Sequence, residues 1–405
     1  MKKKILTGLA AVACGFGMLA VTSCGSSESV KVGFICLHDE TSTYDKNFIE
    51  AAKDVCKEMG VEAVFKTQVD EGAEYDVAVE LAADGCKAIF ADSFGHESGM
   101  VKAAKEYNSI QFFHATGTKA HTEKLANYHN AFASIYEGRY LAGIVAGLKM
   151  NEMIENGDIQ ADEAVMGYVG AYNYAEVVSG YTSFYLGAKS VCDSVTMKVR
   201  YTNSWFSVEK EAAAATQLIE TDGCKLISQH ADSQGAPGVC ESKNVPNVFY
   251  NGNNSASAPK TYLVASRINW RPFFTDMVKT VTENKEMDYD YIGTIASGSV
   301  ELMDINESIA PAGTKEAVAT AKQALINGTL NVFDTDNFTV KNANLDSTIA
   351  EVDADGHLVS YKADVDDDGT YSHEKPVVSD GVFKESFYRS APYFDIRIDG
   401  ITELA

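Results

Sequence analysis

The feature that most constrains the fold is a regular alternation of short apolar runs with amphipathic stretches, which begins at Val30. The apolar runs have the length of buried strands, and the stretches between them carry apolar residues at helical spacing. The expected strands cover 30–37, 61–65, 88–91 and 110–114, and the expected helices cover 47–59, 73–83 and 99–107. Strands that alternate with helices form a parallel sheet with helices on both faces, because each crossover must pack back onto the sheet.

The alternation restarts near Ala164 and contains an internal repeat. The sequence Asp-Gly-Cys-Lys at 84–87 precedes a strand that ends in Ala-Asp-Ser at 91–93, and both motifs recur at 222–225 and 231–233. A repeat in the same helix–strand context indicates two related lobes. The sequence therefore predicts an α/β protein with two doubly wound, Rossmann-like lobes, whose strand carboxyl ends surround a shared cleft.

A change in sequence character sets the last expected boundary. Residues 331–405 are acidic, β-like and rich in Asp and Gly, which supply the backbone angles that tight turns need. We expect them to form a hairpin-rich extension on one lobe. The expected units are 31–133 with 265–330 for the first lobe, 134–264 for the second lobe, and 331–405 for the β-rich C-terminal extension.

The N-terminus has the layout of an export signal. Three lysines at 2–4 precede an apolar stretch at 5–21, and Cys24 follows small residues. This arrangement resembles a bacterial lipobox, in which the signal is cut before the Cys and the Cys is acylated. We expect a lipoprotein signal peptide at 1–23, a lipid on Cys24 and a tether at 24–30, so that acyl chains hold the protein on the extracytoplasmic face of the cell membrane. An ordinary secretory signal or a single membrane helix is the alternative.

The net charge and the absence of catalytic motifs argue against several classes of function. The chain has 34 Lys and Arg against 57 Asp and Glu, a formal net charge of −23. Such an acidic surface repels phosphate backbones, so nucleic-acid partners are not expected. The sequence holds no phosphate-binding loop, no G-x-S-x-G elbow and no H-E-x-x-H pair, so we expect no enzyme. The six cysteines after Cys24 have no zinc-site spacing, and we expect them to behave as small buried residues.

One run in the middle of the chain carries a family resemblance, together with shorter motifs on either side. The run comprises Asn127-Tyr128 and the sequence YEGRYLAGIVAG at 136–147. Further motifs follow the same order along the chain at 91–95, 167–170, 185–189, 203–205, 228–233 and 268–270. Over residues 30–330 the chain resembles the basic membrane protein (Bmp) family. We expect the small residues of the 136–147 run to allow close helix packing and not to touch ligand.

The resemblance implies a function and an architecture. Members of the family are substrate-binding lipoproteins of ABC importers, and several bind purine nucleosides or nucleobases. The implied architecture is the type I periplasmic-binding fold, with two lobes that are joined by three crossover strands and close over ligand by a hinge motion. The implied partners are a small solute and an ABC permease, the implied state is a monomer, and no reaction is performed.

Two loops depart from the family pattern. Family members with nucleoside ligands commonly carry Asp-x-Ser-Phe-Asn in the first loop, where this chain has Thr-Ser-Thr-Tyr-Asp at 41–45. The Asp-rich turn that often grips ribose is here Tyr-Asn-Gly-Asn-Asn at 250–254. A purine nucleoside or nucleobase is therefore the expected ligand class. A sugar or another small solute is the rival within the fold, and a surface sensor or interaction lipoprotein without a transport role is the rival outside it.

A flat heterocycle is held by aromatic faces and by hydrogen bonds to its edge. The loops after the expected strands supply both kinds of side chain, and Asp92 lies among them. For a single aromatic residue the alternative is core packing, and for a histidine it is a structural hydrogen bond. The expected ligand contacts are Tyr44, Asp45, Phe94, Gly95, Tyr172, Tyr174, Asn203, Trp205, His230, Asp232, Asn251 and Trp270.

The extension contains the opening of a calcium-binding loop. Asp364, Asp366 and Asp368 occupy positions one, three and five of an EF-hand-like loop, and Gly369 occupies position six. Position twelve is Lys375 instead of an acid, and the flanking residues resemble strands. An acidic β-turn is therefore favoured over a structural calcium site, and no other cofactor is expected.

Overall fold

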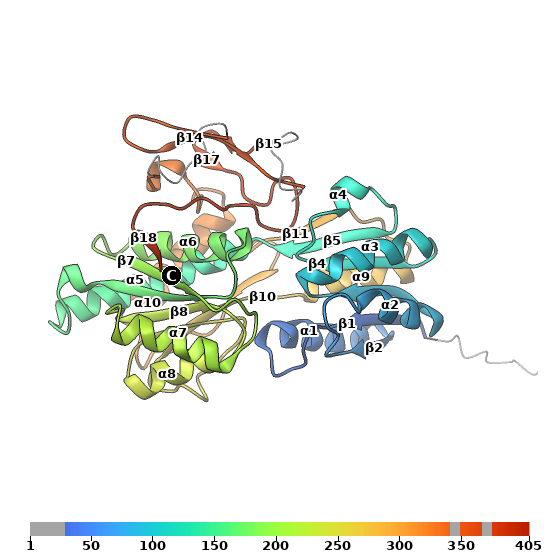
Figure 1. The fold of residues 1–405 in the computed structure, drawn as a ribbon, viewed down its shortest axis with the longest axis horizontal. Coiled ribbons are helices and arrows are strands. Elements are labelled where there is room, and N and C mark those ends of the chain that lie inside the picture. Colours follow the sequence, from blue (N-terminus) through green and yellow to red (C-terminus); the bar gives the residue numbers. More distant parts are fainter. Residues whose placement is uncertain (1–28, 341–348, 367–374, 405) are drawn as a thin grey trace, which may run out of the picture.

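The structure is a computed structural model, which describes residues 29–340, 349–366 and 375–404 (Figure 1). The expected signal peptide at 1–23, the lipid on Cys24 and the third acid of the calcium motif, Asp368, lie outside these ranges. Inside them, no helix combines the length and the apolar character that crossing a membrane requires. The six cysteines inside them are free and buried.

The first lobe is built on a sheet in the order β11-β5-β4-β3-β1-β2, in which every neighbouring pair is parallel. Its strands are β1 (Lys31–Ile35), β2 (Glu62–Lys66), β3 (Cys86–Ala91), β4 (Gln111–Ala115), β5 (Tyr128–Ala133) and β11 (Asp290–Gly293). Its helices are α1 (Thr43–Met59), α2 (Glu74–Ala83), α3 (Glu97–Glu106), α4 (Ala120–Glu123) and α9 (Arg271–Thr282). Phe34 packs into the hydrophobic cluster that contains α1 and α9, and Ile35 packs into the one under α2 and α3. Helices therefore cover both faces, as a parallel sheet requires.

The second lobe has a sheet in the order β12-β10-β9-β8-β6-β7-β18, parallel except for β12. Its strands are β6 (Val165–Gly170), β7 (Thr196–Tyr201), β8 (Leu226–His230), β9 (Asn247–Tyr250), β10 (Tyr262–Ile268), β12 (Val300–Leu302) and β18 (Ile401–Leu404). Its helices are α5 (Ile135–Glu155), α6 (Ala175–Lys189), α7 (Val208–Glu220), α8 (Gly235–Lys243) and α10 (Thr314–Ile326).

The two sheets share one topology. The order β2-β1-β3-β4-β5 of the first lobe corresponds to β7-β6-β8-β9-β10 of the second. The repeated Asp-Gly-Cys-Lys motif overlaps the start of β3 in one lobe and directly precedes β8 in the other. Its glycines, Gly85 and Gly223, have φ values of 92° and 74°. Glycine adopts this left-handed backbone without the steric cost that other residues bear. The predicted pair of doubly wound lobes is confirmed.

The chain passes between the lobes three times. It crosses after β5 at Ser134, after β10 at Asn269 and after β11 at 294–299. The crossings are bonded to one another: Ser134 N donates to Gly293 O at 2.7 Å, and Asn269 N donates to Ser299 O at 2.9 Å.

These crossings correct one expected boundary. We expected residues 265–330 in the first lobe, but only α9 and β11 belong to it. β10 and β12 lie in the second sheet, and α10 packs on α5. The reason is that β10 and β12 lie at the hinge side of the second sheet. The chain leaves β10 for α9 and β11 of the first lobe and then returns to the second sheet at β12.

The C-terminal extension is built from short antiparallel strands around an aromatic cluster. Its strands are β13 (Ala350–Val352), β14 (Leu358–Ala363), β15 (Lys375–Pro376), β16 (Val378–Ser379) and β17 (Val382–Phe383). Phe333 stacks on Phe394 with ring centroids 4.4 Å apart, and Tyr136 of α5 lies 5.2 Å from Phe333. The extension is therefore continuous with the core of the second lobe, and β18 extends the second sheet beside β7.

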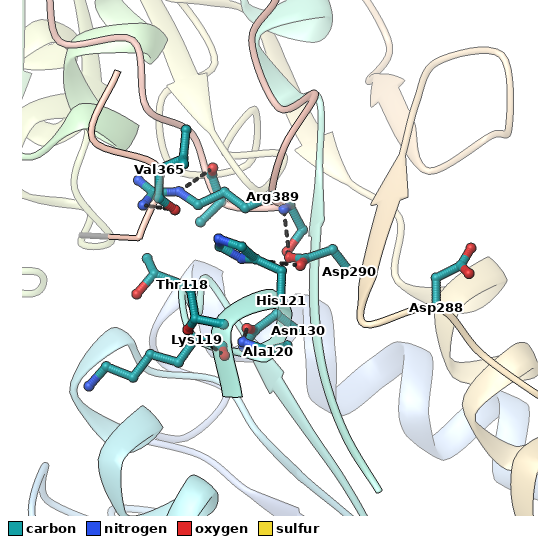
Figure 2. A network of polar contacts seen from close by, with 12 residues as sticks. Thr118, Lys119, Ala120, His121, Asn130, Asp288, Asp290, Val365 and Arg389 are labelled. Atoms are coloured by element: carbon teal, nitrogen blue, oxygen red, sulfur yellow. Dashed lines mark hydrogen bonds and ion pairs between the residues drawn. The ribbon is translucent and has the colours of Figure 1, made fainter. Parts of the chain in front are cut away.

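The extension also reaches the first lobe, contrary to the expectation that it sits on one lobe. Ser390 donates from its backbone N and from Oγ to Asp290 Oδ1 of β11, at 2.7 and 2.8 Å. Figure 2 shows His121 of α4 beside the same carboxylate, with its Nδ1 3.6 Å from Asp290 Oδ2. The neighbouring Arg389 is buried and donates to the carbonyl oxygens of Asp364 and Val365, so a cation lies beside the proposed calcium motif.

Helices α5 and α6 pack closely enough to require glycine. A Cβ on Gly143 would lie 2.0 Å from the carbonyl oxygen of Phe184, and a Cβ on Gly187 would lie 2.0 Å from that of Tyr140. Neither distance is compatible with a side chain. The small residues of the 136–147 run therefore allow close helix packing, as the sequence predicts.

Candidate functional site

A pocket of about 390 Å³ lies between the two lobes, at the carboxyl ends of their parallel strands. Ligands of doubly wound proteins bind at this edge of the sheet. The first lobe contributes Leu37, His38, Tyr44, Ser93, Phe94 and Thr116, and the second contributes Glu176, Trp205, His230, Asp232 and Tyr250.

The lobes touch one another over this pocket. The backbone N and Oγ1 of Thr43 donate to the carbonyl oxygen of Asp232, at 3.4 and 3.3 Å. The rings of Phe94 and Tyr174, from different lobes, are 5.7 Å apart. The lobes are therefore closed over the pocket.

Trp205 is the largest aromatic side chain in the lining. Tyr172 meets it edge-on at 5.1 Å, and Tyr174 stacks on Tyr172 at 5.1 Å with an interplanar angle of 13°. Tyr172 and Tyr174 thus support Trp205 and Phe94 without lining the pocket themselves. On the opposite lobe, the Tyr44 hydroxyl donates to the carbonyl oxygen of Asp92 at 2.8 Å, which fixes its ring at the pocket wall.

The polar groups of the second lobe are buried and mostly neutral. Burial lowers the pKa of His230, whose Nε2 lies 3.4 Å from Glu176 Oε1. Burial raises the pKa of Asp232 well above its usual range, and the charge of Asp45 adds to this shift. A protonated carboxyl both donates and accepts hydrogen bonds. Among the described residues, neither Lys nor Arg lines the pocket.

Asp45 was expected to contact ligand, but the structure places it beneath the pocket. Its Oδ1 accepts a hydrogen bond from His38 N at 2.7 Å, and Oδ2 lies 3.3 Å from His38 Nδ1. Burial works to raise the pKa of Asp45, but the hydrogen bonds from His38 and Ser42 outweigh it and lower the pKa. Asp45 therefore holds the loop that carries His38, because an ionised carboxylate accepts strong hydrogen bonds from that loop.

A second acid shares this buried space. Burial, followed by repulsion from Asp45, raises the pKa of Asp92 well above its usual range, which favours a proton on Asp92 beside Asp45. Possible ligand atoms of Cys36, Asp45 and Asp92 lie within 4.8 Å of one another, which is a set that could hold a metal ion. A proton on Asp92 satisfies the same need for positive charge between the two carboxyl groups.

Trp270 was expected in the ligand site, and the structure places it in the core of the first lobe. It is 2% exposed and stacks on Phe48 with ring centroids 4.3 Å apart. Trp270 immediately precedes α9, and α9 packs on α1 in the first lobe. Its ring is therefore directed into the layer between the two helices and the sheet instead of into the cleft.

Three further expected residues lie outside the lining and shape the loops. Gly95 N donates to Glu71 Oε1 at 3.0 Å, on the far side of its loop. Asn203 and Asn251 have φ values of 51° and 56°, a left-handed backbone that Asn tolerates better than most residues. Both therefore act as turn residues beside the pocket.

Six lining residues were not among the expected contacts. They are Leu37, His38, Ser93, Thr116, Glu176 and Tyr250. Most lie in the loops that the strand pattern placed at the cleft, so their loops could be found from the sequence. Tyr250 is the last residue of β9, and Glu176 is the second residue of α6.

Comparison with known proteins finds a matching family and similar proteins. Residues 12–333 match the model of the Bmp family, described as ABC transporter substrate-binding protein PnrA-like. A purine-binding protein of Brucella abortus (strain 2308) is 32% identical over 314 residues, which cover 76% of this chain and 84% of that protein. A putative ABC transporter glucose-binding protein of Haloferax volcanii is 30% identical over 245 residues, which cover 60% of this chain and 58% of that protein.

Solved structures share the fold at low identity. An ABC transporter solute-binding protein from Conexibacter woesei has a TM-score of 0.62 and 17% identity, and covers 75% of this chain and 98% of its own. One from Aeropyrum pernix K1 has a TM-score of 0.63 and 15% identity, and covers 74% of this chain and 92% of its own. The family match and the relative of similar length together show that this chain belongs to the Bmp family of PnrA-like ABC transporter substrate-binding proteins.

Proposed function

We propose that the pocket binds a purine nucleobase or nucleoside, which the protein delivers to an ABC permease on the extracytoplasmic side of the membrane. The observation that carries this proposal is the combination of aromatic faces from both lobes with the buried hydrogen-bonding groups of His230 and Asp232 in one pocket. Trp205 and Phe94 from opposite lobes supply faces, and Tyr44 and Tyr250 supply further rings. The purine-binding relative supports the same ligand class.

Asp232 and His230 fit the edge of a nucleobase. A protonated Asp232 offers one donor and one acceptor side by side, which matches the adjacent donor and acceptor groups of a purine edge. A neutral imidazole at His230 likewise offers one donor and one acceptor. Because no Lys or Arg lines the pocket, a nucleotide phosphate would be buried without a partner charge.

A sugar is the second candidate. The putative glucose-binding relative favours it, and sugar sites also combine aromatic stacking with carboxyl and amide groups. The aromatic lining of this pocket is shared by both ligand classes, so only a binding measurement separates them.

Isothermal titration of the protein, after unfolding and refolding to remove any carried-over ligand, tests the proposal. We expect adenine, guanine, hypoxanthine and their nucleosides to give saturable heats, and adenosine monophosphate to give none. Binding of glucose, galactose or ribose, with no response to purines, would establish the sugar alternative instead. A lack of response to both panels would favour a surface sensor without a transport role.

We also propose that a lipid on Cys24 anchors the protein to the cell membrane. The expected signal peptide supports this proposal. Intact-mass measurement of the membrane fraction should show an N-terminal acylated Cys, and a Cys24→Ser variant should move to the soluble fraction. An unchanged distribution of the variant would refute the anchor.

A further inference from the structure

Arg139, near the start of α5, is a fully buried cation for which the described part of the chain offers no hydrogen-bond partner. Its exposed fraction is 0%, and Nε, Nη1 and Nη2 all lack an acceptor there. A guanidinium remains ionised in any protein environment. A buried charge without a counter-charge or a hydrogen bond is strongly unfavourable. The group therefore requires an acceptor that the side chains around it do not supply.

The aromatic rings next to Arg139 connect it to the ligand pocket. The guanidinium carbon lies 3.9 Å from the ring centroid of Tyr250 and 5.9 Å from that of Tyr168. The Tyr250 ring is in turn 4.5 Å from the ring of His230, and both rings line or support the pocket wall. Arg139 thus lies directly behind this wall, in the core of the second lobe.

Several hydroxyl groups on the sheet face of Tyr168 and Tyr250, the two rings next to Arg139, also lack partners among the described residues. They are Tyr168 Oη, Ser228 Oγ and Ser266 Oγ, all completely buried. Tyr168 and Ser228 are paired on neighbouring strands β6 and β8, so their side chains share one face. Ser266 on β10 packs against Gly138, the residue before Arg139. These hydroxyls can rotate to donate hydrogen bonds toward a common acceptor.

The titratable groups that face this region do not supply the missing negative charge. Burial raises the pKa of Asp232, Tyr168 and Tyr250, which favours the protonated, uncharged form of each. Burial lowers the pKa of His230, which is therefore uncharged. The Glu176 carboxylate lies against His230 at the pocket, with Oε1 3.4 Å from His230 Nε2, and it makes no hydrogen bond to the guanidinium. Cation–π contacts with two rings compensate the charge only in part.

We propose that Arg139 and the hydroxyls of Tyr168, Ser228 and Ser266 hold a small monovalent anion, chloride in the cell, behind the ligand pocket. A halide fits the donor set, because every group around it can donate and none needs to accept. All four donor residues are completely buried, which favours a small anion over a larger oxyanion. The bound anion would neutralise Arg139 and fix Tyr250 and His230 in the wall, whichever solute the pocket takes.

Bromide substitution in crystals of the full chain is the direct test. Crystals grown without chloride and soaked in sodium bromide should show an anomalous peak within hydrogen-bonding distance of the Arg139 guanidinium. Oxygen-like density without anomalous signal at that position would overturn the proposal, because buried water would then satisfy the donors. This measurement needs no variant and is unaffected by folding of mutants.

Thermal unfolding provides a second test in solution. At constant ionic strength, replacement of gluconate by chloride or bromide should raise the melting temperature of the wild type in a saturable manner. Arg139→Met removes the charge but keeps the length, and it should abolish this response. Arg267→Met, which breaks an exposed ion pair with Glu301 in the same lobe, should retain it. Equal halide responses in wild type and Arg139→Met would refute the site.

Discussion

The two tryptophans of the chain have different roles, although both follow a strand of the second sheet. Trp205 follows β7 and lines the pocket, where Tyr172 holds its ring edge-on. Trp270 follows β10 and stacks on Phe48 in the core of the first lobe. Substitution of each residue therefore tests a different property of the molecule.

Trp205→Ala should weaken binding of the solute by a factor of ten or more, because it removes an aromatic face from the pocket. A tenfold loss corresponds to about 1.4 kcal/mol. Titration calorimetry measures the affinity, and the melting temperature should stay close to that of the wild type. An unchanged affinity in a folded variant would remove Trp205 from the site.

Trp270→Ala should instead destabilise the fold, by about 3–5 kcal/mol for loss of a buried aromatic residue. Denaturant unfolding measures this change. Under conditions where the variant is folded, its affinity for solute should remain close to that of the wild type. A large loss of affinity with unchanged stability would contradict the placement of Trp270 in the core.

Glu385 should make the stability depend on pH. Burial raises its pKa to about 8, from an ordinary value of 4.5. Between these pH values the folded state binds more protons than the unfolded state, so the free energy of unfolding falls as pH rises, by at most about 1.4 kcal/mol per pH unit. Glu385→Gln keeps an acceptor for Tyr393 N and should reduce this slope between pH 5 and 8 in urea titrations. Parallel pH profiles for variant and wild type would disprove this role of Glu385.

At this scale the sequence predicts which loops reach the pocket, but not which side chains face it. Topology alone places the strand ends at one edge, and Tyr44, Phe94, Trp205, His230 and Asp232 of the expected contacts do line the pocket. Asp45 lies one position after Tyr44 and points beneath the floor, because α1 begins at Thr43 and neighbouring helical residues diverge by about 100°. Tertiary packing decides which side chains of that helix face the pocket, and no local sequence pattern shows this.

At the scale of elements, the contact between α5 and α6 depends on two glycines. Gly187→Ala would place a methyl group 2.0 Å from the carbonyl oxygen of Tyr140, so the helices must separate. Overpacking of this kind costs about 1–3 kcal/mol or more, which chemical unfolding would measure. Gly238→Ala in α8 is the control, since no atom lies within 4 Å of its added Cβ, and it should be neutral or slightly stabilising. Equal stability of both variants would argue against tight helix packing.

Most elements could be found from the alternation of apolar runs, and several were predicted to within one residue, such as α2, expected at 73–83, and β4, expected at 110–114. The strands at the hinge side of the second sheet could not be assigned to that sheet from this alternation. The chain leaves the second lobe after β10, enters the first lobe and returns at β12. The sequence of a short apolar run does not show which sheet the run joins. The partner of an edge strand is decided by contacts far away in the sequence.

At the scale of the whole molecule, the extension spans both lobes. It joins the second lobe through β18 and its aromatic cluster, and it meets the first lobe where Ser390 binds Asp290 (Figures 1 and 2). A hinge motion changes the distance between such contact points. The bonds at Asp290 therefore favour the closed arrangement over an open one.

Asp290→Ala removes the acceptor of both bonds from Ser390 and should shift the solute-free protein toward the open arrangement. Hydrogen bonds to a charged group contribute about 1.5–3 kcal/mol. The affinity for solute should therefore fall about tenfold or more, because the closed state is depopulated. Small-angle scattering should show a larger radius of gyration without solute. The exposed Asp336→Ala in the same extension should match the wild type. Identical scattering of both variants would count against the bridge.

The pairing of β18 with β7 also bears on the order in which the molecule can fold. Ile401 pairs with Met197, which lies about 200 residues earlier in the chain, so this ladder is among the most non-local contacts of the fold. Until the later segment has been synthesised, β7 is an edge strand with free N–H and C=O groups, which other chains can pair with. A nascent or truncated chain therefore exposes β7 as an edge strand, which β18 covers in the complete fold. We expect such a chain to need chaperones until β18 has been synthesised.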